Sequence, residues 1–268
     1  MALIMCTGAP GAPGITTTAL GLALTWPRDV LLADCDREPT QAILAGYLHG
    51  VQQPGGGLMT LLRRYRENRP LEAELLSCTI PLTEGDPTER RFLPGFALPT
   101  AIRLFDAVWP SLADALAHLD GQGMDVIVDA GHLDAQGLQL PLLARADAVC
   151  IISRTSLRSL AATRLYLPGL TQQLRSLPVD KPSGLLLLGP GKPYRAPEIT
   201  KQLAVDCWAE IDWDPAVASA LSDGSPGPKK LFQRDLISQY RATGLRIRDR
   251  IKKTSPPPSG FKGEVLSA

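Results

Sequence analysis

A glycine-rich segment close to the N-terminus reads Gly8-Ala9-Pro10-Gly11-Ala12-Pro13-Gly14-Ile15-Thr16-Thr17-Thr18. An apolar run, residues 3–6, leads into it, and a run with helical character, residues 19–25, leads out of it. In the motif G-x-x-x-x-G-K-[ST], backbone N–H groups cradle phosphates, the lysine neutralises their oxygens and the hydroxyl binds Mg²⁺. Here Ile15 stands where that lysine belongs. The segment therefore predicts a phosphate-binding loop in shape that lacks its principal cation.

Length and composition limit the classes of protein that this chain can belong to. Its 268 residues and 44% hydrophobic content suit one large α/β domain. A net charge of +1, from 28 basic and 27 acidic residues, argues against a general binder of polyanions. The five cysteines have no C-x-x-C spacing and the three histidines do not pair, so we expect buried reduced thiols and no structural metal. With no signal peptide and no apolar run of about 20 residues, the expected location is the cytoplasm.

Short apolar runs alternate with segments of helical periodicity along the chain. This alternation predicts a doubly wound, mostly parallel sheet covered by helices on both faces. The expected strands are 2–6, 30–33, 91–93, 126–129, 148–153 and 184–188, and the expected helices are 19–24, 40–48, 58–65, 101–119, 157–174, 196–204 and 230–253. A single domain is expected over 1–253, followed by a disordered tail rich in Pro, Ser and Gly over 254–268.

Acidic residues end two of the expected strands. Asp34 and Asp36 follow the run 30–33, and Asp129 closes the run 126–129. In a doubly wound sheet the carboxyl ends of the strands lie together beside the phosphate loop. A carboxylate at such a strand end is typical of the group that binds the water shell of a metal ion.

Taken in order, these segments resemble the ParA/MinD family of deviant Walker ATPases, which have the SIMIBI type of P-loop fold. The family's loop reads K-G-G-x-G-K-T-T, its second strand ends V-L-L-x-D-x-D-P, and its Walker B strand ends D-x-P. Two later passages are also similar to the family: a short strand with a proline-glycine turn at 91–95, and 209–214 followed by 220–224, which in the family packs near the base. The resemblance covers the chain from Met1 to about Gly224.

The resemblance implies roles for particular residues and also shows where the chain departs from the family. Pro10 takes the position of the signature lysine that reaches across a nucleotide-sandwich dimer, and Ile15 that of the Walker lysine. Thr16 matches the hydroxyl on Mg²⁺, Asp36 the carboxylate that positions the attacking water, and Asp129 the Walker B acid that completes the Mg²⁺ site. The loop residues implied to contact nucleotide are Gly11, Ala12, Gly14, Ile15, Thr16 and Thr17. Because a charge-assisted contact contributes about 1.5–3 kcal/mol, losing one lysine should weaken ATP binding tenfold to a hundredfold or more.

Other interpretations of the same residues stay open. The loop can be a tight turn with a threonine N-cap, and the aspartates can cap the next helix or pair with Arg37. A Rossmann dinucleotide site is also conceivable, because Asp34 follows Gly14 at about the distance of a ribose-binding acid. Arg37 and Arg154 are the candidates for replacing the missing lysines.

The basic segment 229–253 carries an apolar stripe beside many lysines and arginines. Such a helix can lie on an anionic membrane, touch DNA, or pack on the domain with a charged outer face. A peripheral membrane or polar location would follow from the first of these.

Three functional hypotheses remain. The first is a pseudo-ATPase, resembling the TadZ and CpaE branch, that acts as a scaffold or positioning factor for a secretion or pilus machine through protein partners. The second is a slow genuine ATPase that partitions DNA or membrane cargo by nucleotide-dependent dimerisation. The third is a constitutive homodimer. The resemblance implies ATP and Mg²⁺ as cofactors, although the missing cations argue against binding of a triphosphate, and the interface of the constitutive homodimer would not need nucleotide.

Overall fold

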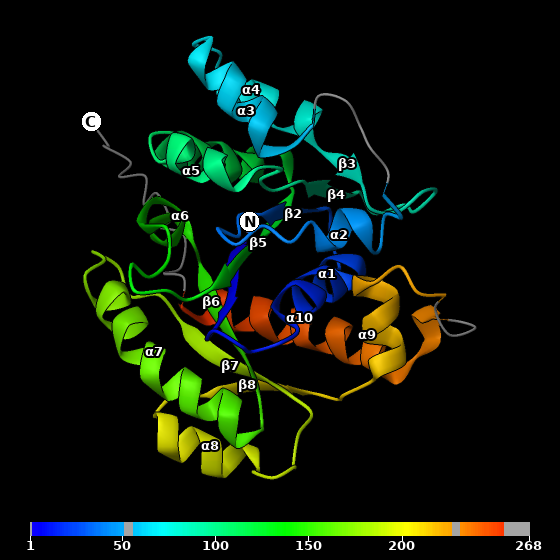
Figure 1. The fold of residues 1–268 in the computed structure, drawn as a ribbon, viewed down its shortest axis with the longest axis vertical. Helices are drawn as coiled ribbons and strands as arrows, with labels where there is room; N and C mark the ends of the chain where they lie inside the picture. The colour runs from blue at the N-terminus through cyan, green and yellow to red at the C-terminus, as the bar shows by residue number, and fades with distance from the viewer. Residues whose placement is uncertain (1, 51–55, 227–230, 255–268) are drawn as a thin grey trace, which may run out of the picture.

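Eight strands form one sheet in the computed structural model, which describes residues 2–50, 56–226 and 231–254 (Figure 1). Their spatial order is β3-β4-β2-β5-β1-β6-β7-β8. Every neighbouring pair is parallel except β3 and β4, which are antiparallel. The strands are β1 (Leu3–Gly8), β2 (Val30–Asp34), β3 (Ile80–Pro81), β4 (Arg90–Leu93), β5 (Asp125–His132), β6 (Ala148–Arg154), β7 (Ser183–Leu188) and β8 (Cys207–Ile211).

Helices cover both faces of this sheet. One layer contains α1, α2, α9 and α10, and the opposite layer contains α3 to α8. Their bounds are α1 (Ile15–Thr25), α2 (Ala42–Ala45), α3 (Gly57–Arg66), α4 (Leu71–Glu74), α5 (Trp109–His118), α6 (Leu140–Arg145), α7 (Leu157–Arg175), α8 (Ala196–Leu203), α9 (Pro215–Ser222) and α10 (Asp235–Thr254). The predicted fold class, a doubly wound and mostly parallel α/β domain, is thereby confirmed.

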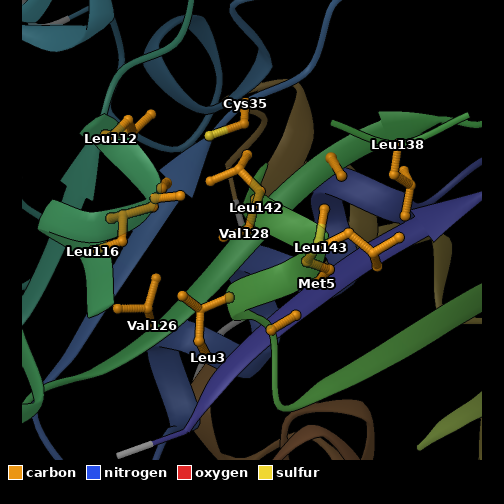
Figure 2. Packing of buried hydrophobic residues seen from close by; sticks show 14 of the residues in the cluster. Leu3, Met5, Cys35, Leu112, Leu116, Val126, Val128, Leu138, Leu142 and Leu143 are labelled. Carbon is orange, nitrogen blue, oxygen red and sulfur yellow. The ribbon is translucent and has the colours of Figure 1, made fainter. Parts of the chain in front are cut away.

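The core consists of two apolar clusters, one on each face of the sheet. Alternate residues of a strand point to opposite faces, so Leu3 and Met5 join one cluster while Ile4 and Cys6 join the other. Figure 2 shows the first cluster, in which leucines of α5 and α6 pack over β1 and β5. Because both faces of β1 are fully buried, the strand reads as a continuous apolar run in the sequence.

Some elements differ from the sequence-based expectation. The helix expected over 101–119 is broken: a 3₁₀ segment, Pro99–Phe105, precedes α5, which starts at Trp109 with Pro110 in its first turn. Proline is favoured in that turn because it has no N–H to donate to the preceding turn. The helix expected over 40–48 shortens to α2. Five short elements were not predicted: β3, β8, α4, α6 and α9.

The last described helix, α10, packs against α1 through small residues. A Cβ at Gly21 would lie 2.4 Å from the Tyr240 ring, and one at Gly244 would lie 3.0 Å from the Trp26 ring. Gly244 therefore permits a close helix contact and does not interrupt α10. Thr254, expected as the first residue of the tail, is the last residue of this helix, and 255–268 lie outside the described residues.

Candidate functional site

The loop between β1 and α1 has the backbone shape that its glycines predict. Gly11 and Gly14 adopt left-handed conformations with φ of 73° and 98°, which side chains with a Cβ rarely tolerate. The Ala12 N–H donates to the Ala9 carbonyl at 3.0 Å and so closes the first turn of the loop. Pro10 and Pro13 have no N–H to offer an anion. The loop keeps its curvature but presents fewer donors than a glycine-rich loop would.

Ile15 does not point toward a ligand. Its side chain is 4% exposed and belongs to the apolar cluster beneath α1. Its Cδ1 lies only 2.9 Å from where a Cβ at Gly8 would sit, so the side chain packs along the start of the loop. Hydrocarbon fills the position at which the phosphate-binding motif has an ammonium group.

The register of the sheet brings the predicted carboxylates together. Asp34 pairs with Asp129 across β2 and β5, and both side chains are almost completely buried. Asp36 lies two residues further and is 8% exposed. Gly131 and Gly95 make room for this cluster, since a Cβ at Gly131 would lie 2.0 Å from Asp36 Oδ1 and one at Gly95 would lie 2.6 Å from Asp34 Cγ.

Backbone N–H groups satisfy part of this negative charge. The Gly131 N–H donates to Asp129 Oδ1 at 3.0 Å, and the Glu38 N–H donates to Asp36 Oδ1 at 2.8 Å. The Asp36 N–H donates to Asp34 Oδ1 at 3.2 Å. These three bonds hold the carboxylates in fixed directions without adding a positive charge.

Burial raises the pKa values of all three carboxyl groups. Burial, followed by the charge of Asp129, raises the pKa of Asp34 to about 8. Burial raises the pKa of Asp129 to about 6, although the neighbouring Thr16 hydroxyl and the Gly131 N–H act in the opposite direction. The pKa of Asp36 is also raised by burial. The raised pKa of Asp34 therefore favours its protonated form near neutral pH.

The site keeps the groups that would face a metal ion. Asp129 Oδ2 is buried and accepts no hydrogen bond from any described residue. Thr16 lies beside this carboxylate, close enough for its hydroxyl to lower the pKa of Asp129. Hydroxyl and carboxylate oxygens are the donors that Mg²⁺ prefers, together with phosphate oxygens and water. Thr16 and Asp129 thus fit a nucleotide-bound Mg²⁺, and no metal-binding group of three or more His, Cys, Asp or Glu occurs among the described residues.

The two arginines that are candidates for replacing the lysines already have partners within the protein. Arg37 pairs with Asp134 at 2.7 Å and donates to the Gly137 carbonyl, away from the loop. The Arg154 guanidinium lies 4.0 Å from the centroid of the Trp213 ring. The cation beside the loop is Arg158 on α7, whose Nη2 lies 3.6 Å from where a Cβ at Gly11 would sit. Sequence reasoning missed it, because only the adjacency of β6 to β1 brings the start of α7 to the loop.

A cavity of about 470 Å³ opens between the loop and the late passage of the chain. Pro13, Gly14 and Thr17 form its loop side, and Trp213 and Asp214 are among the residues on its other side. This volume is within the range of about 300–1,000 Å³ that is usual for small-molecule sites. The passage 209–214, expected to pack near a base, therefore lies beside the loop, as β8 and the turn into α9.

The basic C-terminal helix uses its apolar stripe inside the protein. Five of its large side chains are buried against α1 and β8: Leu236, Ile237, Tyr240, Ile247 and Ile251. These five side chains are covered by the protein itself, as expected for a helix packed on the domain with a charged outer face. Contact of its basic face with a membrane or with DNA stays a prediction. The basic side chains remain at or near the surface, and Lys229 and Lys230 lie outside the described residues. In the part of the chain that the structure describes, no helix is long and apolar enough to cross a membrane.

Comparison with known proteins supports the fold directly. No family model matches the chain, and no curated protein matches its sequence. Solved structures do match its fold: a ParA family ATPase from Chlorobium tepidum has a TM-score of 0.67 at 16% identity, covering 91% of this chain and 98% of the other. The septum site-determining protein MinD from Pyrococcus horikoshii, solved with Mg-ADP, has a TM-score of 0.67 at 19% identity, with coverages of 96% and 99%. MinD from Aquifex aeolicus, in a complex with MinC, has a TM-score of 0.66 at 14% identity, with coverages of 96% and 98%.

Proposed function

We propose that this chain, which has the fold of ParA and MinD ATPases, is a pseudo-ATPase that binds nucleotide weakly and acts as a scaffold or positioning factor. The observation that carries the proposal is the side chain of Ile15, which fills the lysine position with buried hydrocarbon. Phosphoryl transfer depends on preorganised positive charge around the transferring oxygens. The loop has none of its own, and three buried carboxylates lie behind it.

The groups that the fold retains suit binding better than catalysis. When bound, Mg²⁺ would supply charge to phosphate oxygens, and Thr16 and Asp129 are the residues that would hold it. Asp36 lies where a water molecule could be oriented, but burial raises its pKa and a carboxylate cannot neutralise phosphate charge. This chain's own residues can therefore orient a nucleotide without stabilising the charge that develops during transfer.

A protein contact is the output that this proposal assigns to the molecule. One structural neighbour is a MinD solved in complex with MinC, so this fold can present a partner-binding surface. By analogy we place the chain nearest to the TadZ and CpaE branch, with a secretion or pilus machine as its setting and a homodimer as a candidate assembly.

Turnover of Mg-ATP by the purified full chain tests the proposal. We expect no phosphate release above the level of the variants Asp36→Ala and Thr16→Ala, because the cations needed for transfer are missing. The double substitution Pro10→Lys with Ile15→Lys returns both cations and should raise turnover, provided that its circular dichroism shows a folded chain. A wild-type rate that Asp36→Ala abolishes would overturn the proposal and favour the slow, genuine ATPase.

A further inference from the structure

Arg158 is the cation that lies against the phosphate-binding loop. It is the second residue of α7, and its Nη2 lies 3.6 Å from where a Cβ at Gly11 would sit. Its side chain is exposed, and within the described ranges no hydrogen bond, ion pair or ring contact involves its guanidinium. Unlike Arg37 and Arg154, Arg158 has no ion pair, hydrogen bond or ring contact among the described residues that a ligand would have to replace.

We infer that Arg158 binds the terminal phosphate of a nucleoside di- or triphosphate and replaces, from a neighbouring helix, the charge that the loop lacks. This inference rests on the proposed function, because it assumes that the loop still receives nucleotide. A guanidinium has a planar fork of donors that matches phosphate oxygens and keeps its charge at any physiological pH. Arg158 can therefore approach from outside the loop without the buried position that Ile15 occupies.

The geometry of the site sets the class of ligand. The cavity of about 470 Å³ touches the loop at Pro13 and Gly14, whereas Arg158 meets the loop three residues earlier, at Gly11. A ligand with its nucleoside in the cavity and its phosphates along the loop extends toward Arg158 at its far end. A nucleoside monophosphate is too short to occupy the cavity and reach Arg158 at the same time. Affinity should therefore increase with the number of phosphates, from AMP to ADP to ATP.

The position of Arg158 also explains how the chain would bind a nucleotide without catalysing phosphoryl transfer. Arg158 stands on an exposed helix surface, where water competes for its charge. A charge-assisted contact of this kind strengthens ground-state binding. Catalysis instead needs donors that are fixed before the reaction starts. Arg158 is accordingly a binding residue and not a catalytic one.

Affinities of the full chain for ATP, ADP and AMP, measured by isothermal titration calorimetry with Mg²⁺, test the inference. We expect Arg158→Ala to weaken ATP binding about tenfold to a hundredfold, and to weaken AMP binding much less. Arg164→Ala is the matched control, because Arg164 is also an exposed arginine of α7 but lines a different cavity, against α8. Thermal melts without nucleotide should be the same for both variants and the wild type.

Distinct outcomes separate this inference from the proposed function. Equal ATP affinities for wild type and Arg158→Ala, or no nucleotide binding by the wild type, would overturn the role of Arg158 and leave the absence of turnover untouched. Equal losses for Arg158→Ala and Arg164→Ala would also overturn it, since the effect would then come from general surface charge. Turnover by the wild type would refute the pseudo-ATPase, while a selective loss of ATP affinity in Arg158→Ala would still support the assignment of Arg158.

Discussion

Strand β5 carries two buried aspartates, Asp125 at its first residue and Asp129 nearer its carboxyl end, and their surroundings differ in charge. Asp125, at the first residue, accepts hydrogen bonds at 2.9 Å from both the Ala2 N–H and Trp26 Nε1. Arg28 and Arg248 approach it to 3.4 and 3.5 Å. Asp129, four residues later, has an unpartnered oxygen and two other carboxylates for neighbours.

Burial alone does not distinguish these two carboxylates, since both side chains are at most 1% exposed. The difference lies in their partners. Arg28, which follows α1, and Arg248, on α10, form ion pairs with Asp125, whereas within the described residues no ion pair includes Asp129, on which the basic residue His132 acts. A buried carboxylate oxygen without a hydrogen-bond partner is destabilising, and Asp129 Oδ2 is such an oxygen.

The largest expected effect on stability follows from removing the negative charge of Asp125. Asp125→Asn leaves Arg28 and Arg248 without a counter-charge and places an NH₂ group among donors, so we expect a loss of about 3–5 kcal/mol in the free energy of unfolding. Asp129→Asn removes one of three repelling carboxyl groups and should change stability by less than about 1 kcal/mol, or increase it. Urea denaturation at pH 7.5 measures both. Equal losses of stability in Asp125→Asn and Asp129→Asn would show that the two carboxylates do not differ in their surroundings.

An intermediate effect on stability is expected from adding an atom beside the carboxylates near the carboxyl end of β5. Gly131→Ala adds a Cβ at φ 62°, 2.0 Å from Asp36 Oδ1, and should lower stability by about 2 kcal/mol because the carboxylate must move and the backbone is strained. Gly121→Ala is the control, since nothing lies within 4 Å of the added atom and its φ is not positive. Thermal melts compare the two variants. Similar losses in both would mean that Gly131 gives the carboxylates no particular room.

A further effect, spread over several pH units, is a dependence of stability on pH. Asp34 and Asp129 have pKa values of about 8 and about 6 in the folded chain, against about 4 when unfolded. The folded state therefore binds more protons, and this contribution to stability is complete below pH 4 and is lost as pH rises toward 8. Asp34→Asn should flatten the profile by up to about 1.4 kcal/mol per pH unit. Urea midpoints between pH 5 and 8 that fall equally in wild type and variant would contradict this expectation.

Much of the fold could be predicted because its signals are local. The run that becomes β1 is apolar on both faces, and the glycines of the loop match its two left-handed residues. Asp34 and Asp129 could be placed together because each follows an apolar run in a strand of a parallel sheet. The helix break at Trp109 was also readable, since Pro110 favours a first turn, but the long apolar periodicity concealed it.

The rest depends on contacts between distant segments, which periodicity does not record. Arg158 reaches the loop only because β6 lies beside β1. The stripe on α10 shows that a helix is amphipathic and does not show whether α1 or a bilayer covers it. Gly244 reads as a helix breaker until Trp26 is seen against it. The functional difference between Asp125 and Asp129 is likewise invisible in the run Asp125-Val126-Ile127-Val128-Asp129.

The packing of α10 against α1 affects how the chain folds during its synthesis on the ribosome. Arg248 binds a carboxylate that also holds Ala2 and Trp26, so segments from both ends of the chain meet at one point. Until residues near 250 leave the exit tunnel, the side of α1 that α10 contacts stays uncovered, while β5 and α9 cover other sides of this helix. Contacts between residues that are far apart in the sequence slow folding, and the intermediates expose apolar surface that chaperones protect from aggregation. Truncation before Asp235 should therefore yield aggregated protein rather than a smaller functional domain.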